Sequence, residues 1–340
     1  MPNILNFGSN LVFDTINELE NYVLVTQNPP FTPSLNESLS NQPIHSIYPT
    51  NVDLNSLEQL SHNNILKAKI EHVVGFGGGV AIDTAKFLSW KWDKKLIQIP
   101  SIISTDAFLT HEIGVRIENR VRYIGKAIPE QIIIDYEIIK SAPKVLNYAG
   151  TCDVLSICTA LGDWKIAHDK FGDKFDSKIF QKARKCAQNL INDAPAIKDM
   201  QEEGIQKLVG YLQEEMRICE EWGSARPEEG GEHHLAYCIE ELSPKRYLHG
   251  ALVALNILTV LRLQGDSAEF SDHELKDFFD HIGHSYKFEQ IGITSDLYKK
   301  ALHEIQSYVT KEKLEKGIWY TKNPFSKISI SDLINWILEF

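Results

Sequence analysis

The pattern of short apolar runs changes near residue 140, and this change limits what the chain can fold into. Before that point, four runs rich in Val, Ile and Leu predict strands at residues 22–26, 72–76, 96–100 and 131–135. A helical pattern from about Ala81 to Trp90 separates the second run from the third. Strands that alternate with helices favour a parallel sheet covered on both faces.

After Ser141-Ala-Pro143 the β-rich runs stop, and Ser141 is the expected N-cap of the next helix. Helical patterns follow at residues 149–170, 178–191, 197–222, 232–241, 250–263, 271–282 and 331–338. A chain of 340 residues is also long for one hydrophobic core. We therefore expect an α/β domain over residues 1–145 and an all-helical domain over residues 146–340.

Charge and cysteine content narrow the class of protein. The net charge of -11 argues against a nucleic-acid or anionic-membrane partner, because both need a basic surface. Five cysteines without a CxxC pair fit a reducing compartment. The first residues lack the pattern of a signal peptide, and the longest apolar stretch, Gly250–Leu263, is too short to cross a bilayer. We expect a soluble cytoplasmic protein.

Three successive glycines, Gly77, Gly78 and Gly79, lie between a predicted strand and a predicted helix. Such a turn lets the backbone approach a ligand closely, and the N–H groups of the helix N-terminus can then bind a pyrophosphate. A tight strand–helix turn without a ligand would have the same composition. The pattern is not GxGxxG, and no acidic residue clearly closes the next strand, so the choice between NAD and NADP stays open.

Two histidines, His233 and His249, fall near the ends of neighbouring predicted helices. Their spacing alone fits a metal site, and it fits equally well two polar side chains at helix ends.

Longer motifs surround these features and resemble a known superfamily. They are GGG-x-x-ID-x-AK at residues 77–86, IPSIISTD at residues 99–106, and AGTCDVLS at residues 149–156 with TALGDWK at residues 159–165. Together they are similar to the signatures of iron-type alcohol dehydrogenases, glycerol dehydrogenases and dehydroquinate synthases. The sn-glycerol-1-phosphate dehydrogenases are the most similar group, and the resemblance covers roughly residues 70–265.

The resemblance implies a Rossmann-like domain with a parallel sheet, an all-α domain, and an active site in the cleft between them. It implies one divalent metal on Asp153, His233 and His249, which are also the catalytic residues. A carboxylate with two imidazoles suits zinc, with iron or nickel as alternatives. Such a metal would polarise a ketone or lower the pKa of an alcohol. His234 is not an expected ligand, because adjacent helical positions point about 100° apart.

The same resemblance implies contacts for the other ligands. NAD(H) or NADP(H) would lie against Gly77, Gly78, Gly79, Asp83, Ser101, Ser104 and Thr110. Asp106 and Tyr237 would contact the substrate. The implied activity is the interconversion of dihydroxyacetone phosphate and sn-glycerol 1-phosphate, or of a similar small phosphorylated ketone and its alcohol. Proteins of this group are commonly homo-oligomers.

Two departures from the family pattern leave alternatives open. Tyr237 stands where the glycerol-1-phosphate enzymes have a substrate-contacting His, and Ala251 stands where the superfamily commonly has Glu. Another polyol or alcohol dehydrogenase is therefore an alternative. A dehydroquinate-synthase-like cyclase is a further alternative. Those enzymes, however, usually have Glu at the position of Asp153 and a Lys nearby, and this chain has neither. A non-catalytic metal- or nucleotide-binding protein is the third.

Overall fold

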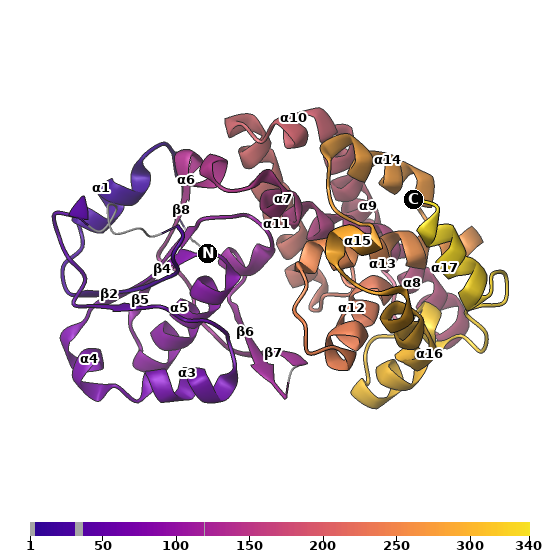
Figure 1. The fold of residues 1–340 in the computed structure, drawn as a ribbon, viewed down its shortest axis with the longest axis horizontal. Coiled ribbons are helices and arrows are strands. Elements are labelled where there is room, and N and C mark those ends of the chain that lie inside the picture. The colour runs from indigo at the N-terminus through magenta and orange to yellow at the C-terminus, as the bar shows by residue number, and fades with distance from the viewer. Residues whose placement is uncertain (1–3, 31–36, 119) are drawn as a thin grey trace. The chain divides into compact units, whose positions relative to one another are not determined.

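The computed structural model describes residues 4–30, 37–118 and 120–340 (Figure 1). The chain divides into two compact units, Met1–Asn147 and Tyr148–Phe340. This division lies two residues after the boundary that the sequence patterns predict.

The first unit contains a six-stranded parallel sheet in the order β1-β8-β5-β4-β2-β3. Its strands are β1 (Ile4–Gly8), β2 (Tyr22–Thr26), β3 (His45–Ile47), β4 (His72–Gly77), β5 (Lys95–Pro100) and β8 (Gln131–Asp135). All four predicted strands are present, and the predicted parallel sheet is confirmed. The strands β1 and β3 were not predicted; β3 has only three residues, too few for a periodic pattern.

Helices cover both faces of this sheet. In β2, Tyr22 and Leu24 join the core beneath α1 (Leu11–Asn17), whereas Val23 and Val25 join the core on the opposite face. That second core also contains side chains of α3 (Leu54–Ser61), α4 (Asn64–Lys69) and α5 (Gly79–Trp92). Figure 1 shows α1 on one side of the sheet and α3 and α4 on the other. Because both faces are buried, every residue of β2 is apolar or fully buried, as a covered parallel strand requires.

The strand order reverses between β2 and β4. From β2 the chain passes to β3 at the edge of the sheet, and it then returns to form β4 on the other side of β2. Ligands of open α/β sheets bind at such a switch point, outside the carboxyl ends of the strands. The glycine turn follows β4 directly and therefore lies at this point.

An antiparallel hairpin, β6 (Glu112–Ile117) and β7 (Arg120–Lys126), inserts between β5 and β8 and was not predicted. Two side chains of α5 hold it. The Asp83 carboxylate accepts a hydrogen bond from the Gly114 N–H at 3.2 Å, and Lys86 Nζ donates to the Glu112 carbonyl at 2.6 Å. Asp83 and Lys86 also pair with each other at 2.8 Å.

The connection to the second unit differs from the prediction at Ser141. This residue is the last of α6 (Tyr136–Ser141), and the next helix, α7 (Lys144–Tyr148), begins after Pro143. The prediction of Ser141 as an N-cap is therefore wrong. Its hydroxyl instead donates to the Ile138 carbonyl within α6.

The second unit contains helices and no strand across its described residues, 148–340, so the predicted all-helical domain is confirmed. Its helices are α8 (Gly150–Phe171), α9 (Ser177–Asn192), α10 (Ala194–Asp199), α11 (Glu202–Trp222), α12 (Gly231–Leu242), α13 (His249–Gln264), α14 (Asp272–Ile282), α15 (Phe288–Ile291), α16 (Ser295–Glu312) and α17 (Ile330–Leu338). The pattern over residues 197–222 divides into α10 and α11 at Met200, which has a φ of 50°.

Two helices, α8 and α13, are buried along almost their whole length. The helical segment Lys144–Phe171 has the length and hydropathy of a membrane span. However, 89% of its apolar 18-residue stretch is buried inside the protein, as in a core helix. At the start of α13, a Cβ on Gly250 would lie 2.3 Å from the Ala149 carbonyl oxygen. Glycine at this position therefore allows the first turn of α13 to approach the first turn of α8 closely.

Candidate metal centre

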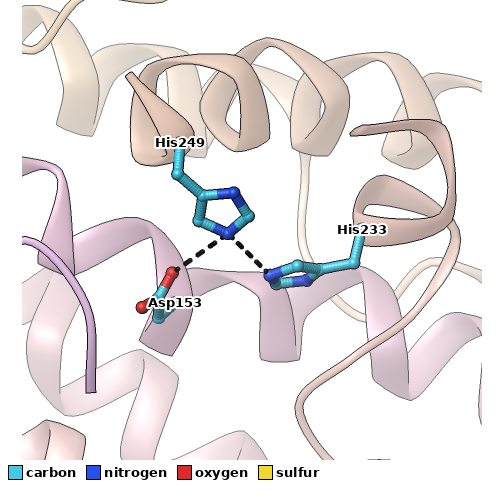
Figure 2. A group of neighbouring side chains, drawn as sticks. All are labelled: Asp153, His233 and His249. Atoms are coloured by element: carbon cyan, nitrogen blue, oxygen red, sulfur yellow. Dashed lines mark hydrogen bonds and ion pairs between the residues drawn. The ribbon is translucent and has the colours of Figure 1, made fainter. Parts of the chain in front are cut away.

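Asp153, His233 and His249 come together in the second unit (Figure 2). One ligand atom from each lies within 4.8 Å of the others. His249 Nε2 is 3.3 Å from His233 Nε2 and 3.8 Å from Asp153 Oδ1. Within the described ranges, no other three His, Cys, Asp or Glu side chains form such a group.

Each of the three side chains belongs to the first turn of a helix. Asp153 is the fourth residue of α8, His233 is the third residue of α12, and His249 is the first residue of α13. Asp153 and His233 are buried, whereas 30% of the His249 side chain is exposed. The packing of three helix N-termini thus assembles the group, with His249 on its solvent side.

A fourth side chain, Glu232, orients one of the imidazoles. Its fully buried carboxylate accepts hydrogen bonds from His233 Nδ1 at 2.8 Å, from the Gly230 N–H at 2.8 Å, and from the Thr159 hydroxyl. A proton on Nδ1 leaves Nε2 of the neutral ring as the atom that faces His249. Carboxylates of this kind commonly orient metal-binding histidines. This role of Glu232 was not predicted from the sequence, although the residue directly precedes His233.

The ionisation of His233 in the metal-free protein follows from this pair. Burial disfavours the imidazolium, but the hydrogen bond and negative charge of Glu232 outweigh burial and raise the pKa of His233 to about 10. The same contacts hold the pKa of Glu232 below its ordinary value despite the burial of the carboxylate. A metal that takes Nε2 must therefore displace a proton from this ring.

The donor set fits a divalent metal. One carboxylate and two imidazoles are the ligands that zinc and ferrous iron share, and three protein ligands leave positions open for substrate oxygens. The neighbouring His234 is not part of the group. Burial lowers the pKa of His234 to about 3, so this ring is neutral at physiological pH.

Tyr237 lies beside the group, one helical turn after His233. The centroids of the two rings are 6.0 Å apart, and the side chain is half-buried. Its hydroxyl is hydrogen-bonded to the carboxylate of Glu229, a residue for which no role was predicted from the sequence. Tyr237 is thus on the face of α12 that the spacing predicts, and its contact with a substrate stays a prediction.

The glycine turn in the first unit has the geometry of a close backbone approach. Gly77 has a φ of 159°, and a Cβ there would lie 2.8 Å from the Ala81 Cβ. Gly78 is the N-cap of α5, and Gly79 is its first residue. A Cβ on Gly79 would meet nothing within 4 Å, so the space beside this residue is open. The turn can therefore accommodate a phosphate at the helix N-terminus.

The segment after β5 lies beside this turn, because Gly77 pairs with Pro100 and the Ser101 N–H donates to the Gly77 carbonyl at 2.9 Å. Ser101 is buried, and Ser104 and Thr110 are half-buried. Asp106 is half-buried and begins a short 3-10 helix, Asp106–Phe108.

The glycine turn and the segment after β5 lie at the carboxyl end of the sheet in the first unit. Their contacts with a cofactor or substrate stay predictions. Asp83, also expected at the cofactor, uses its carboxylate to hold Lys86 and the hairpin, so its observed partners are structural.

Comparisons with known proteins agree with these features. A family model described as iron-containing alcohol dehydrogenase matches residues 25–143. The glycerol-1-phosphate dehydrogenase [NAD(P)+] of Sulfolobus acidocaldarius is 32% identical over 251 residues, covering 74% of this chain and 70% of the relative. The enzyme of the same name from Methanospirillum hungatei is 29% identical over 251 residues, covering 74% and 68%.

Solved structures share the fold. A probable glycerol dehydrogenase from Sinorhizobium meliloti matches with a TM-score of 0.69 at 17% identity, covering 99% of this chain and 96% of the other. Glycerol dehydrogenase from Schizosaccharomyces pombe matches with a TM-score of 0.68 at 16% identity, covering 99% and 88%.

Proposed function

Because the chain belongs to the iron-type alcohol dehydrogenase superfamily, among its sn-glycerol-1-phosphate dehydrogenase-like members, we propose that it interconverts dihydroxyacetone phosphate and sn-glycerol 1-phosphate with NAD(H) or NADP(H). The observation that carries the proposal is the convergence of Asp153, His233 and His249 to within 4.8 Å. A divalent metal held by these side chains would polarise the reacting oxygen during hydride transfer.

We infer that these three side chains hold one divalent metal, with zinc as the proposed ion and iron or nickel as the alternatives. The ion would supply a Lewis acid at the carbonyl oxygen of the ketone, or at the hydroxyl of the alcohol. Asp153 contributes the negative charge of the ligand set, and Glu232 holds the His233 ring in place through Nδ1. The partly exposed His249 faces the solvent side, where a substrate can enter.

The nicotinamide cofactor would carry the hydride, and we propose that its pyrophosphate binds over Gly77, Gly78 and Gly79. The support is the switch point of the sheet together with the N-terminus of α5, where the helix dipole and the first N–H groups favour an anion. Ser101, Ser104 and Thr110 would line the same edge. Asp83 would act there by holding the hairpin, and Asp106 would contact the substrate.

We further propose that the protein works in the cytoplasm as a homo-oligomer on a small phosphorylated substrate. Among the described residues, one helical segment is long and apolar enough to span a membrane, and its burial inside the protein supports a soluble protein. The net charge of -11 is unfavourable for anionic surfaces such as nucleic acid or phospholipid.

The proposal is tested with protein that has been stripped of metal and reloaded with zinc, iron or nickel in turn. Each form is mixed with NADH or NADPH and dihydroxyacetone phosphate, and the loss of nicotinamide absorbance is followed. We expect turnover that needs the metal and that is lost in His249→Ala. The product should be sn-glycerol 1-phosphate on chiral analysis. Reduction of other ketones with none of dihydroxyacetone phosphate would overturn the proposed substrate.

A further inference from the structure

Three side chains lie together at the start of α12, and we call Glu229, His233 and Tyr237 the stripe. His233 and Tyr237 are four residues apart on α12 and therefore lie above one another, whereas Glu229 precedes the helix by two residues. Side chains on a helix lean towards its N-terminus. Tyr237 follows this rule: its ring lies 6.0 Å from that of His233, and its hydroxyl reaches back to the Glu229 carboxylate.

The backbone fixes Glu229 in place. Its N–H donates to the Ala225 carbonyl at 2.7 Å, in the turn that precedes α12. The side chain is half-buried, and it approaches the neighbouring imidazole closely enough for the two charges to affect each other's ionisation. A carboxylate has about four lone-pair positions, so the bond from Tyr237 leaves capacity for further donors. The stripe therefore places a hydrogen-bond acceptor beside a metal ligand.

Such a pair distinguishes the chemical groups that could lie against it. A substrate hydroxyl can donate to the Glu229 carboxylate and accept from or donate to the Tyr237 phenol. A methyl group can do neither. A phosphate would face the like charge of the carboxylate, which costs free energy at close range in a partly buried site. The pair thus favours an uncharged hydroxyl.

We propose that Glu229 and Tyr237 form a subsite for the hydroxyl group on the carbon next to the reacting carbonyl, which restricts the enzyme to α-hydroxy ketones. This inference rests on the proposed function, because it takes the metal centre as the place of the reacting oxygen. In dihydroxyacetone phosphate, the free hydroxymethyl group would occupy the subsite. The phosphate, on the other side of the carbonyl, would point away from Glu229.

The size of the preference follows from burial. Sites that fully bury the groups which bind a substrate hydroxyl reject analogues lacking it by roughly 10⁴-fold or more. Glu229 and Tyr237 are only half-buried, and water can replace the missing hydroxyl there. We therefore expect a smaller preference, about 100-fold in kcat/KM, for dihydroxyacetone phosphate over hydroxyacetone phosphate, whose methyl group replaces the hydroxymethyl group.

The test compares these two ketones in the metal-loaded enzyme and in variants. Glu229→Ala and Tyr237→Phe should each lower the preference at least about tenfold, mainly by reducing kcat/KM for the hydroxylated ketone. Glu228→Gln is the matched control, because its carboxylate contacts Cys219 at 3.7 Å. The control should keep the wild-type preference. Metal content and thermal unfolding establish that each variant is folded and loaded.

Two further comparisons separate the inference from the proposed function. Hydroxyacetone against acetone tests the hydroxyl without a phosphate, because acetone has no hydroxyl on either carbon next to the carbonyl. Calorimetric binding of glycerol 1-phosphate against propane-1,2-diol 1-phosphate tests it without turnover. A hydroxyl preference confined to the unphosphorylated ketones would support the subsite and overturn only the proposed substrate. Equal kcat/KM values and equal binding within every pair, or a preference unchanged in both Glu229→Ala and Tyr237→Phe, would overturn the subsite.

Discussion

The pairing of Glu232 with His233 predicts how many protons the protein releases when it binds its metal. In the metal-free protein the pKa of His233 is about 10, so at pH 8 about 99% of these rings carry a proton that a metal must displace. We expect Glu232→Gln to remove the charge that maintains this proton. The pKa of His233 should then fall towards its ordinary value of about 6.5, because burial disfavours the imidazolium while the charges of Glu229 and Glu228 still favour it.

The magnitude follows from these two pKa values. At pH 8 the wild type should release about one more proton per metal than Glu232→Gln, because the variant ring is already largely neutral. The affinity of the wild type for the metal should also rise about tenfold per pH unit up to about pH 10, whereas the metal affinity of Glu232→Gln should level off nearer pH 7. At pH 7 the displaced proton costs the wild type about 4 kcal/mol, at about 1.4 kcal/mol for each of three pH units.

Isothermal titration of the stripped protein with zinc, in buffers of different ionisation enthalpy, measures the protons released. Asp163→Asn is the control, since Asp163 is also a buried carboxylate but accepts from the Gly231 and Ile318 N–H groups. Its proton release should match that of the wild type. The same number of protons from Glu232→Gln and the wild type would refute the assignment of the raised pKa to Glu232.

Three further substitutions test the centre and the glycine turn. His249→Ala should abolish stoichiometric metal binding. In the presence of a chelator, it should change the free energy of unfolding by no more than about 0.5 kcal/mol, because the side chain is partly exposed. If the variant still binds one metal per chain, His249 is not a ligand. Gly79→Val should weaken NAD(H) binding at least about tenfold and leave the metal content unchanged. Gly210→Ala, a control that is also in open space, should leave NAD(H) binding unchanged. Equal NAD(H) affinities of Gly79→Val and the wild type would exclude the pyrophosphate from the turn. Gly250→Ala should lower the free energy of unfolding by about 1–3 kcal/mol, as measured in urea, because its Cβ would collide with the Ala149 carbonyl; wild-type stability would show that α8 and α13 separate freely.

The choice of Gly79 for the cofactor test depends on the structure. From the sequence, any of the three glycines could block a ligand once it carries a side chain. A Cβ on Gly78 would lie 3.2 Å from Ile102 Cδ1, so a valine there would disturb packing as well as binding. Gly79 has open space, and a substitution there reports on the ligand alone.

The sequence by itself determined the features that arise within short segments. The four predicted strands and the change to helices after residue 140 depend on periodicities that adjacent residues carry, and the structure contains them. The same signal was present and overlooked in α16, where Tyr298, Leu302, Ile305 and Val309 repeat at helical spacing. The hairpin was also overlooked, although apolar residues alternate with other residues at Ile113, Val115 and Ile117 of β6, the pattern of a half-buried strand; contacts from α5 stabilise it.

The metal ligands were identified in sequence only through the resemblance, because helix-end histidines have no local signature of a site. Only the tertiary structure brings Asp153, His233 and His249 together, since their distances depend on how α8, α12 and α13 pack. The same holds for the partners of the ligands. That Glu232 binds His233 and that Glu229 binds Tyr237 is decided by side-chain direction at the start of α12, which no pattern of residue types specifies.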